Sequence, residues 1–286
     1  VDAPSIIPED SMAETIGRYQ LLESLGTGTL GELHRARDLE RGRTVALRVL
    51  AESFVQDHER LTALLKDVDR ASAASHPALP ALYEDGQDGH VTYLASEYVS
   101  GERLSDIVHG TPLNARRALD FAVQIADGLA AAHAEGLEHG ALSTRRILIT
   151  MKGAVKILDV GMLPWTATPE PERCDDYLGL GEVVFEMLTG RPVKRGWPAE
   201  LKHDHIPEVV RPILKRLLAE RGTEVYPSMA VASAALRDAL LRLTAAPPAP
   251  AAVPEPESAP LITTDTRVRP VVWMALAVVV VLAVVW

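Results

Sequence analysis

The sequence is poor in cysteine and carries fewer basic than acidic residues. Cys174 is the single cysteine among 286 residues, so no disulfide can form within the chain and no thiolate cluster can bind a metal. We therefore expect the folded part to lie in a reducing cytosol. Its 29 Lys and Arg stand against 39 Asp and Glu, a formal charge of −10. This balance disfavours binding a polyanion over a broad face, and nucleic acid is not an expected partner.

Composition divides the chain into four segments. After a tail at residues 1–17, residues 18–243 are mixed in character and carry most of the charged and aromatic side chains, which predicts a folded domain. Residues 244–269 form a linker rich in proline and alanine near the membrane, where the prolines prevent a continuous helix and favour extended geometry. Residues 270–286 are almost entirely apolar.

The apolar segment predicts a transmembrane helix. Val271 to Trp286 contains no charged side chain and would reach roughly 24 Å as a helix, against roughly 30 Å for the hydrocarbon core. We expect a single-pass span over 270–286, cut short where the sequence stops; the alternative is a buried core helix or strand. Arg267 and Arg269 precede the run with no counterpart after it. The positive-inside rule then places the domain on the cytoplasmic side of the inner membrane.

A glycine-rich loop lies near the start of the folded domain. Gly26, Gly28 and Gly31 form the pattern G-x-G-x-x-G between two strand-like segments, Tyr19–Leu25 and Glu32–Ala36. A dinucleotide-binding fingerprint requires a helix after the glycines, and none is predicted here. Taken alone, the motif is more typical of an ordinary glycine-rich hairpin than of a nucleotide-binding loop.

The elements and motifs that follow occur in a recognisable order. They are the strand Thr44–Leu50 containing Val45-Ala46-Leu47-Arg48, a helix from about Asp57 to Ala74, His76-Pro77, strands near Tyr83 and over Val91–Tyr98, Glu97-Tyr98-Val99, and Asp176 followed by the run from Leu180 to Gly190. In this order the chain resembles a bacterial Hanks-type serine/threonine protein kinase from Gly17 to about Leu243. The resemblance implies an α+β, two-lobed kinase-like fold with a β-rich N-lobe at 18–98 and a helical C-lobe at 99–243.

The resemblance also implies a nucleotide site between the lobes. The candidate residues are Gly26, Gly28, Gly31, Leu33, Ala46, Arg48, Glu97, Val99, Leu148 and Asp159. Ala46, Leu33 and Leu148 match positions that sandwich adenine in the family, but the same residues would also make good core. Packing of the core is therefore the competing interpretation.

Two departures from the family affect the N-lobe. Arg48 stands in place of the third-strand lysine that neutralises phosphates, and Asp67 in place of the helix C glutamate that pairs with it. Arginine is longer than lysine and aspartate is shorter than glutamate, so the two side chains together span a similar distance. An Arg48–Asp67 ion pair is therefore one hypothesis. Two unconnected surface charges are the other.

The catalytic loop departs further. Where the family reads H-R-D-x-K-P-x-N, this chain reads His139-Gly140-Ala141-Leu142-Ser143-Thr144-Arg145-Arg146. His139 matches the motif, whereas Ala141 replaces the base, Ser143 the lysine that steadies the transferred phosphate, and Arg146 the metal-binding asparagine. A methyl group cannot accept a proton, and loss of a general base typically costs about 10²–10⁴-fold in rate.

Asp159 is the remaining candidate ligand for magnesium, in a D-V-G version of the metal-binding turn. We expect Arg146 to pair with it and replace the charge of the metal. Only 16 residues separate Asp159 from Asp176, fewer than the activation segment of active kinases. Thr166 and Thr168 in this stretch are candidates for phosphorylation by another kinase, or simply solubilising.

Together these features predict a catalytically inactive kinase-like domain, a pseudokinase, that acts as a membrane-tethered regulatory or scaffolding module in signalling. The expected partner is a cytoplasmic signalling protein or another kinase. No cofactor is expected, and ATP and magnesium would bind weakly at most. The alternatives are an ATP-binding sensor without turnover and a serine/threonine kinase of low activity that uses Asp159 and Arg48.

Overall fold

The computed structural model describes residues 14–162, 165, 175–194, 201–202, 204–219 and 225–245. All of them belong to the first of two units into which the chain divides, Val1–Ala245 and Ala246–Trp286. The predicted proline-rich linker and transmembrane helix lie almost entirely outside the described residues. No helix in the described ranges combines the length and apolar character needed to cross a membrane.

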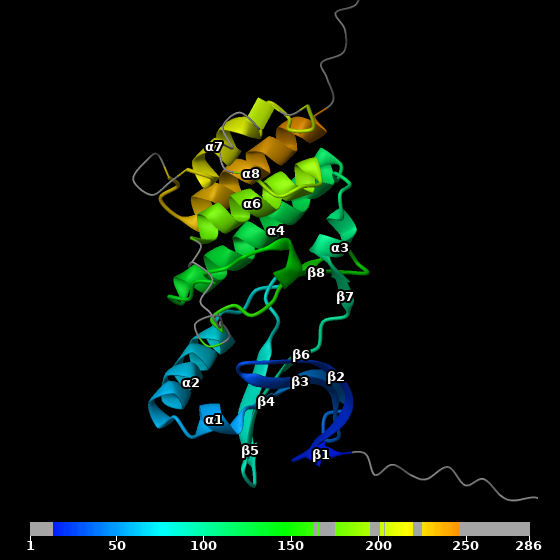
Figure 1. The fold of residues 1–286 in the computed structure, drawn as a ribbon. Helices are drawn as coiled ribbons and strands as arrows, with labels where there is room; N and C mark the ends of the chain where they lie inside the picture. The colour runs from blue at the N-terminus through cyan, green and yellow to red at the C-terminus, as the bar shows by residue number, and fades with distance from the viewer. Residues whose placement is uncertain are drawn as a thin grey trace, which may run out of the picture. The chain divides into compact units, whose positions relative to one another are not determined.

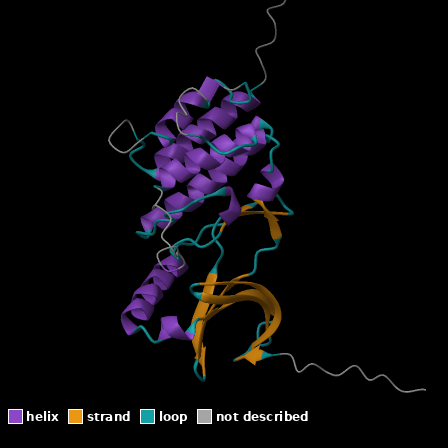
Figure 2. Cartoon of the chain, in the orientation of Figure 1, coloured by secondary structure: helices purple, strands orange, loops and turns teal. Residues whose placement is uncertain are grey.

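The N-lobe is built on a six-stranded antiparallel sheet with the order β1-β2-β3-β4-β6-β5 (Figures 1 and 2). Its strands are β1 (Thr15–Ile16), β2 (Tyr19–Gly28), β3 (Gly31–Asp38), β4 (Arg43–Leu50), β5 (Leu82–Asp88) and β6 (Val91–Glu97). The predicted strands of this lobe are all present, and the glycine-rich loop is the β2–β3 hairpin.

Alternate side chains of β4 point into the N-lobe core and toward the candidate site. Val45 and Leu47 are fully buried and pack with Tyr19 and Tyr93 on one face of the sheet. Because successive side chains point to opposite faces, Ala46 and Arg48 project from the other face. The two-residue alternation that buries Val45 and Leu47 in the core therefore also places Ala46 and Arg48 on the face of the candidate site.

Helix α2 (His58–Ala73) follows the short helix α1 (Glu52–Val55) and corresponds to the predicted helix C. It begins where the Asp57 side chain accepts a hydrogen bond of 3.0 Å from the Arg60 amide, a typical N-cap. Its buried face, with Leu64 and Val68, packs in a cluster with Phe54 and Leu30 of the glycine-rich loop. Helix α2 and the glycine-rich loop therefore contribute side chains to the same apolar cluster.

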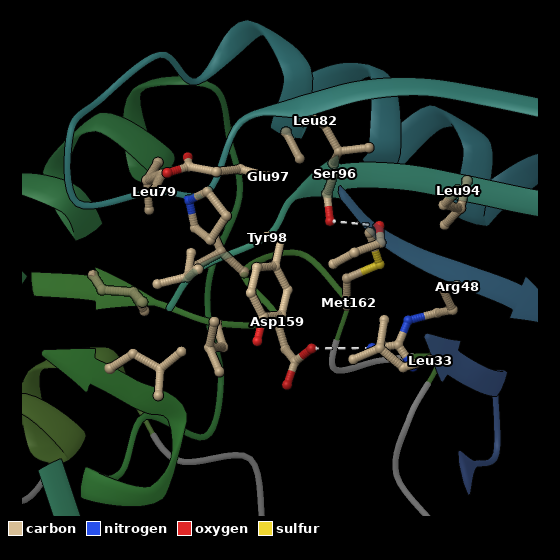
Figure 3. A pocket seen from close by; sticks show the side chains of 18 of the residues that line it. Leu33, Arg48, Leu79, Leu82, Leu94, Ser96, Glu97, Tyr98, Asp159 and Met162 are labelled. Atoms are coloured by element: carbon tan, nitrogen blue, oxygen red, sulfur yellow. Dashed lines mark hydrogen bonds and ion pairs between the residues drawn. The ribbon is translucent and has the colours of Figure 1, made fainter. Parts of the chain in front are cut away.

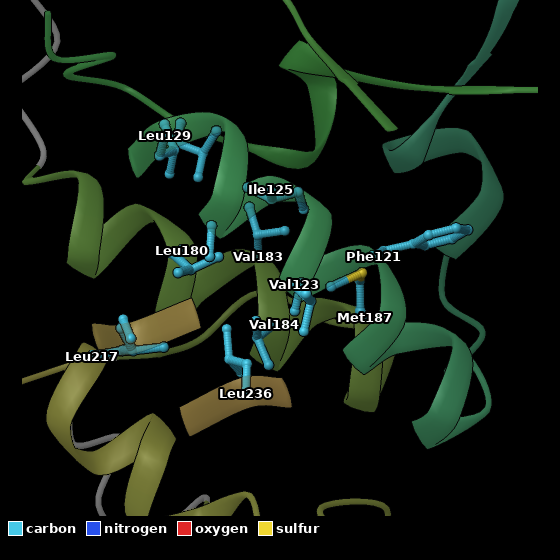
Figure 4. Packing of buried hydrophobic residues seen from close by; sticks show 14 of the residues in the cluster. Phe121, Val123, Ile125, Leu129, Leu180, Val183, Val184, Met187, Leu217 and Leu236 are labelled. Atoms are coloured by element: carbon cyan, nitrogen blue, oxygen red, sulfur yellow. The ribbon is translucent and has the colours of Figure 1, made fainter. Parts of the chain in front are cut away.

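The C-lobe is helical. Its elements are α3 (Leu104–Val108), α4 (Ala115–Ala134), α6 (Asp176–Thr189), α7 (Arg211–Leu217) and α8 (Met229–Thr244). Side chains of α4 and α6 interdigitate with Leu217 and Leu236 from the last two helices (Figure 4). Helix α6 is mostly buried and ends at Gly190 in the left-handed conformation, at φ 72°, where glycine avoids the Cβ clash. The predicted buried C-lobe helix is therefore present.

A small antiparallel sheet carries the loops of the site. Its strands are β7 (Gly101–Arg103), β8 (Ile147–Thr150) and β9 (Val155–Ile157), with the short 3₁₀ helix η1 (Thr144–Arg146) just before β8. The catalytic-loop residues enter β8, and Asp159 follows β9 by two residues. Pairing of β8 with β9, Ile147 opposite Ile157, therefore holds Arg146 and Asp159 close together.

Candidate functional site

An apolar cavity of about 240 Å³ lies between the N-lobe sheet and strands β8 and β9 (Figure 3). Leu33, Ala46, Val99 and Leu148, four of the predicted nucleotide residues, line it. Arg48, Glu97 and Asp159 are further lining residues. Most of the predicted nucleotide-binding residues therefore line one cavity, whose surface is largely apolar.

The end of β6 is fixed beside this apolar cavity, where Glu97-Tyr98-Val99 forms the segment between the two lobes, called the hinge below. Glu97 accepts a hydrogen bond of 2.7 Å from Lys156 Nζ and one of 3.1 Å from the Ala81 amide. Ser96, the residue before Glu97, donates a hydrogen bond of 3.3 Å to the Ala46 carbonyl oxygen. Lys156 lies three residues before Asp159, so this ion pair links the hinge to the strand that carries the D-V-G turn. The sequence analysis did not find this pair, because its partners are 59 residues apart.

A second, wider cavity of about 660 Å³ adjoins the first and shares Leu25, Leu33, Arg48 and Asp159 with it. We call it the arginine cavity. Its other lining residues are Gly26, Thr27, Gly28, Arg103, Ala141, Leu142, Ser143, Arg145, Arg146 and Glu182. The glycine-rich loop and the altered catalytic loop thus face the same space.

Gly31, the third predicted loop glycine, lines neither cavity. Its φ is +122°, and a Cβ atom there would lie 1.9 Å from the Val49 carbonyl oxygen. Only glycine fits such a close approach of two strands. The role of Gly31 is therefore to shape the hairpin rather than to contact a ligand in these cavities.

Asp159 lies between two guanidinium groups. Its Oδ1 is 3.5 Å from Arg48 Nη2, and its Oδ2 is 3.7 Å from Arg146 Nη1. The expected Arg146–Asp159 pairing is present. Asp159 also has φ 61° and is the one non-glycine residue with positive φ in the described part of the chain, a backbone conformation that costs energy and clusters at functional sites.

The hypothesis of an Arg48–Asp67 ion pair is wrong. Arg48 reaches Asp159 instead, and Asp67 contacts Arg70 Nη1 at 3.4 Å on its own helix and Trp165 Nε1 at 3.2 Å. The indole of Trp165 also packs edge-on against Phe54. Trp165, which follows the D-V-G turn, is thus the partner of Asp67 on helix α2, where the sequence predicted Arg48.

Buried polar contacts hold the catalytic loop in place although its catalytic residues are altered. Asp176 accepts hydrogen bonds from the His139 and Gly140 amides at 2.9 and 2.7 Å, and its Oδ2 lies 2.7 Å from His133 Nε2. Burial by itself would raise the pKa of Asp176, but these hydrogen bonds lower it. The bond to Asp176 raises the pKa of His133. The loop backbone is therefore anchored independently of Ala141.

His139 is fully buried behind this loop, and burial lowers its pKa. Its Nδ1 accepts a hydrogen bond from the Ala141 amide at 3.3 Å. The side-chain hydrogen bond of His139 is thus within its own loop and its amide is held by Asp176, which favours a structural role for the retained histidine.

Glu182 of α6 is a site residue that the sequence analysis missed. It lines the arginine cavity together with Ala141. Burial, together with Glu186 one turn away, raises the pKa of this carboxyl group. Its position at the middle of a helix with an apolar pattern hid it, because periodicity predicts which residues are buried but not which of them border a cavity.

The residues around Asp159 do not fit the magnesium site that the family resemblance implies. Among the described residues, no three His, Cys, Asp or Glu side chains gather into a group able to hold a metal ion. The position of the second ligand is taken by Arg146, which offers donors and a positive charge instead of an oxygen atom.

Comparison with known proteins defines the family. The model of the protein kinase domain matches residues 19–174, which span more than half of the chain. This chain is a member of the protein kinase family. The match runs from the start of β2 through the catalytic loop to Asp159 and beyond, and it confirms the resemblance to protein kinases expected from the sequence. The β-rich N-lobe and the helical C-lobe of the described structure confirm the expected two-lobed fold.

Bacterial serine/threonine kinases are among the relatives of this kinase domain. The serine/threonine-protein kinase PknB of Mycobacterium tuberculosis is 32% identical over 222 residues, which cover 67% of this chain and 36% of the relative. PrkC of Bacillus subtilis is 29% identical over 199 residues, covering 61% and 31%. The chain therefore spans about a third of the length of these relatives.

The kinase domain of PknI from Mycobacterium tuberculosis has the same fold. It superposes with a TM-score of 0.64 at 20% identity and covers 79% of this chain and 98% of the PknI domain. At this identity the likeness establishes the fold alone.

Proposed function

We propose that this kinase domain does not transfer phosphate and acts as a membrane-tethered regulatory or scaffolding module in signalling. The observation that carries the proposal is the Asp159 carboxylate held between Arg48 and Arg146 in a cavity where Ala141 replaces the base. Phosphoryl transfer depends on positioning and on neutralising charge with metal ions. Here Ala141 replaces the proton acceptor, and Arg146 replaces the second metal ligand and pairs with the first, Asp159. The proposed partner is a cytoplasmic signalling protein or another kinase.

Restoring the base alone tests how these losses combine. The Ala141→Asp variant is expected to transfer no detectable labelled phosphate, because Arg146 still competes with the metal for Asp159 and the stretch to Asp176 stays short. Incubation with γ-labelled Mg-ATP and a generic protein substrate measures this. Transfer by the single variant, abolished again by Asp159→Ala, would favour the alternative of a low-activity kinase.

A second candidate function is an ATP sensor without turnover. The apolar cavity favours it, since Leu33, Ala46 and Leu148 line a hollow beside an intact hinge. The three side chains are half-buried rather than fully buried, which supports a place in a pocket wall over core packing, the competing interpretation. Binding and transfer are separate properties, so this candidate is compatible with the loss of the base.

The membrane part of the proposal rests on the apolar segment and on Arg267 and Arg269. We expect the kinase domain to lie in the cytoplasm, attached to the inner membrane by one helix. Protease added to spheroplasts with an intact inner membrane should leave the domain uncut, whereas the same protease cuts it after the membrane is opened with detergent. Digestion before opening would contradict the topology, and recovery of the whole chain in the aqueous fraction would contradict the membrane attachment.

A further inference from the structure

The arginine cavity carries an excess of positive charge in a chain that is acidic overall. Four arginines line it, Arg48, Arg103, Arg145 and Arg146, against two carboxylates, Asp159 and Glu182. The whole chain has a formal charge of −10. A concave surface of opposite sign to the rest of the molecule concentrates anions.

The charges of this cavity are only partly neutralised by one another. The single carboxylate of Asp159 is shared between Arg48 and Arg146, with separations of 3.5 and 3.7 Å that are longer than strong charge-assisted hydrogen bonds. Both guanidinium groups are partly exposed, with 17% and 30% of their side-chain surface accessible. The side chain of Arg145 is exposed and forms no hydrogen bond or ion pair with another residue in the described part of the chain. Donors therefore remain for an anionic ligand.

The arginine cavity is continuous with the apolar cavity. Leu25, Leu33, Arg48 and Asp159 border both spaces, and Figure 3 shows Arg48 and Asp159 meeting at the edge of the apolar side. A ligand that fills both must have an apolar, flat end and an anionic end. Nucleoside di- and triphosphates have this division, with the base in the apolar cavity and the phosphates among the arginines.

We propose that the cleft binds a nucleoside di- or triphosphate without a divalent metal, with the guanidinium groups of Arg48, Arg145 and Arg146 in the role of the cation. Magnesium then weakens binding for two reasons. It neutralises part of the phosphate charge that the arginines recognise, and it brings its own charge close to Arg146. Guanidinium groups bind phosphate oxygens through paired hydrogen bonds without any metal. The inference rests on the proposed loss of phosphoryl transfer, for which the same Arg146–Asp159 pair is responsible.

Melting and titration of the full 286-residue chain in mild detergent test the inference. Millimolar ATP with EDTA is expected to raise the melting temperature by several degrees, and an excess of MgCl₂ should remove most of that rise. In calorimetric titrations we expect ATP to bind at least about fivefold more tightly in EDTA than in MgCl₂, a change worth about 1 kcal/mol. Adenosine and inorganic tripolyphosphate, which each carry one end of the ligand, should each bind more weakly than ATP.

The matched variants are Arg146→Asn and Arg242→Gln. Arg146→Asn removes one guanidinium and restores the amide oxygen that the family uses for metal. It should weaken binding of metal-free ATP about tenfold, the scale of one lost charge-assisted hydrogen bond, and abolish the inhibition by magnesium. Arg242, on α8, forms an exposed ion pair with Asp238 outside both cavities, and its substitution removes one charge without either effect.

Three results would overturn the inference: no rise in melting temperature with metal-free ATP, equal or tighter binding with magnesium, or the same affinity for Arg146→Asn as for Arg242→Gln. Transfer of labelled phosphate in the same samples separates this inference from the proposed function. Magnesium-enhanced binding without transfer refutes the metal-free site but leaves the domain inactive. Transfer by the unmutated chain refutes the inactivity itself.

Discussion

Incubated with γ-labelled Mg-ATP, the unmutated chain is expected to label neither itself nor a generic protein substrate. Ala141 cannot accept the proton of a substrate hydroxyl, and general-base catalysis alone is typically worth about 10²–10⁴-fold. Asp159 is held by Arg48 and Arg146 at 3.5 and 3.7 Å, so a magnesium ion would have to displace guanidinium groups to reach it. Proton removal from the substrate hydroxyl and metal binding at Asp159 are both impaired, so we expect phosphate transfer to be undetectable.

The control for this assay is the Asp159→Ala variant, prepared and assayed in parallel. A trace of a contaminating kinase labels both samples equally, whereas genuine activity of this chain depends on Asp159. Label that appears in the unmutated chain and vanishes in the variant would show that the domain is an active kinase. A protein kinase active under the same conditions establishes the sensitivity of the measurement.

Replacing Asp176 by alanine is expected to cause the largest loss of stability among single changes near the site. The buried carboxylate of Asp176 holds the His139 and Gly140 amides and His133. Its removal leaves one buried amide, one partly buried amide and a histidine without their acceptor. Breaking a buried, charged network in this way typically costs about 3–5 kcal/mol, which corresponds to a fall in melting temperature of roughly 10 °C for a domain of this size.

Asp238→Ala is the matched control for that measurement. Asp238 forms an ion pair of 2.8 Å with Arg242, but 58% of its side chain is exposed, and such surface pairs contribute about 0–1 kcal/mol. Asp176→Asn keeps one acceptor oxygen and should fall between the two, which guards against a variant that fails to fold. Equal melting temperatures for Asp176→Ala and Asp238→Ala would contradict the anchoring role of Asp176.

The sequence was informative where the signal is local. Alternation along Thr44–Leu50 predicted a strand, and the same alternation placed Ala46 and Arg48 away from the core. The Arg146–Asp159 pairing was also predicted from the sequence, because both residues match metal-ligand positions of the family; the structure adds that they lie next to β8 and β9, two short strands that pair with each other. The partner of Arg48 could not be predicted, because the sequence does not determine which carboxylate lies within reach of a long, flexible side chain.

Some predictions concern residues beyond the described part of the structure. Thr166 and Thr168 lie there, as do the apolar segment 270–286 and Arg267 and Arg269. Phosphorylation of the two threonines by another kinase and attachment to the membrane therefore remain predictions from sequence.

What the sequence by itself determined is the family, the order of the elements and the chemical losses, because each depends on residue identity at fixed spacing within a motif. Tertiary structure alone decided that Asp67 contacts Trp165, that Lys156 holds Glu97, and that Glu182 borders the cavity of Ala141. Each of these contacts joins residues at least 41 positions apart in the chain. Tertiary packing, within the C-lobe or between the lobes, brings them together, and no local pattern of hydrophobicity or charge determines which distant side chain occupies a given position in the packing.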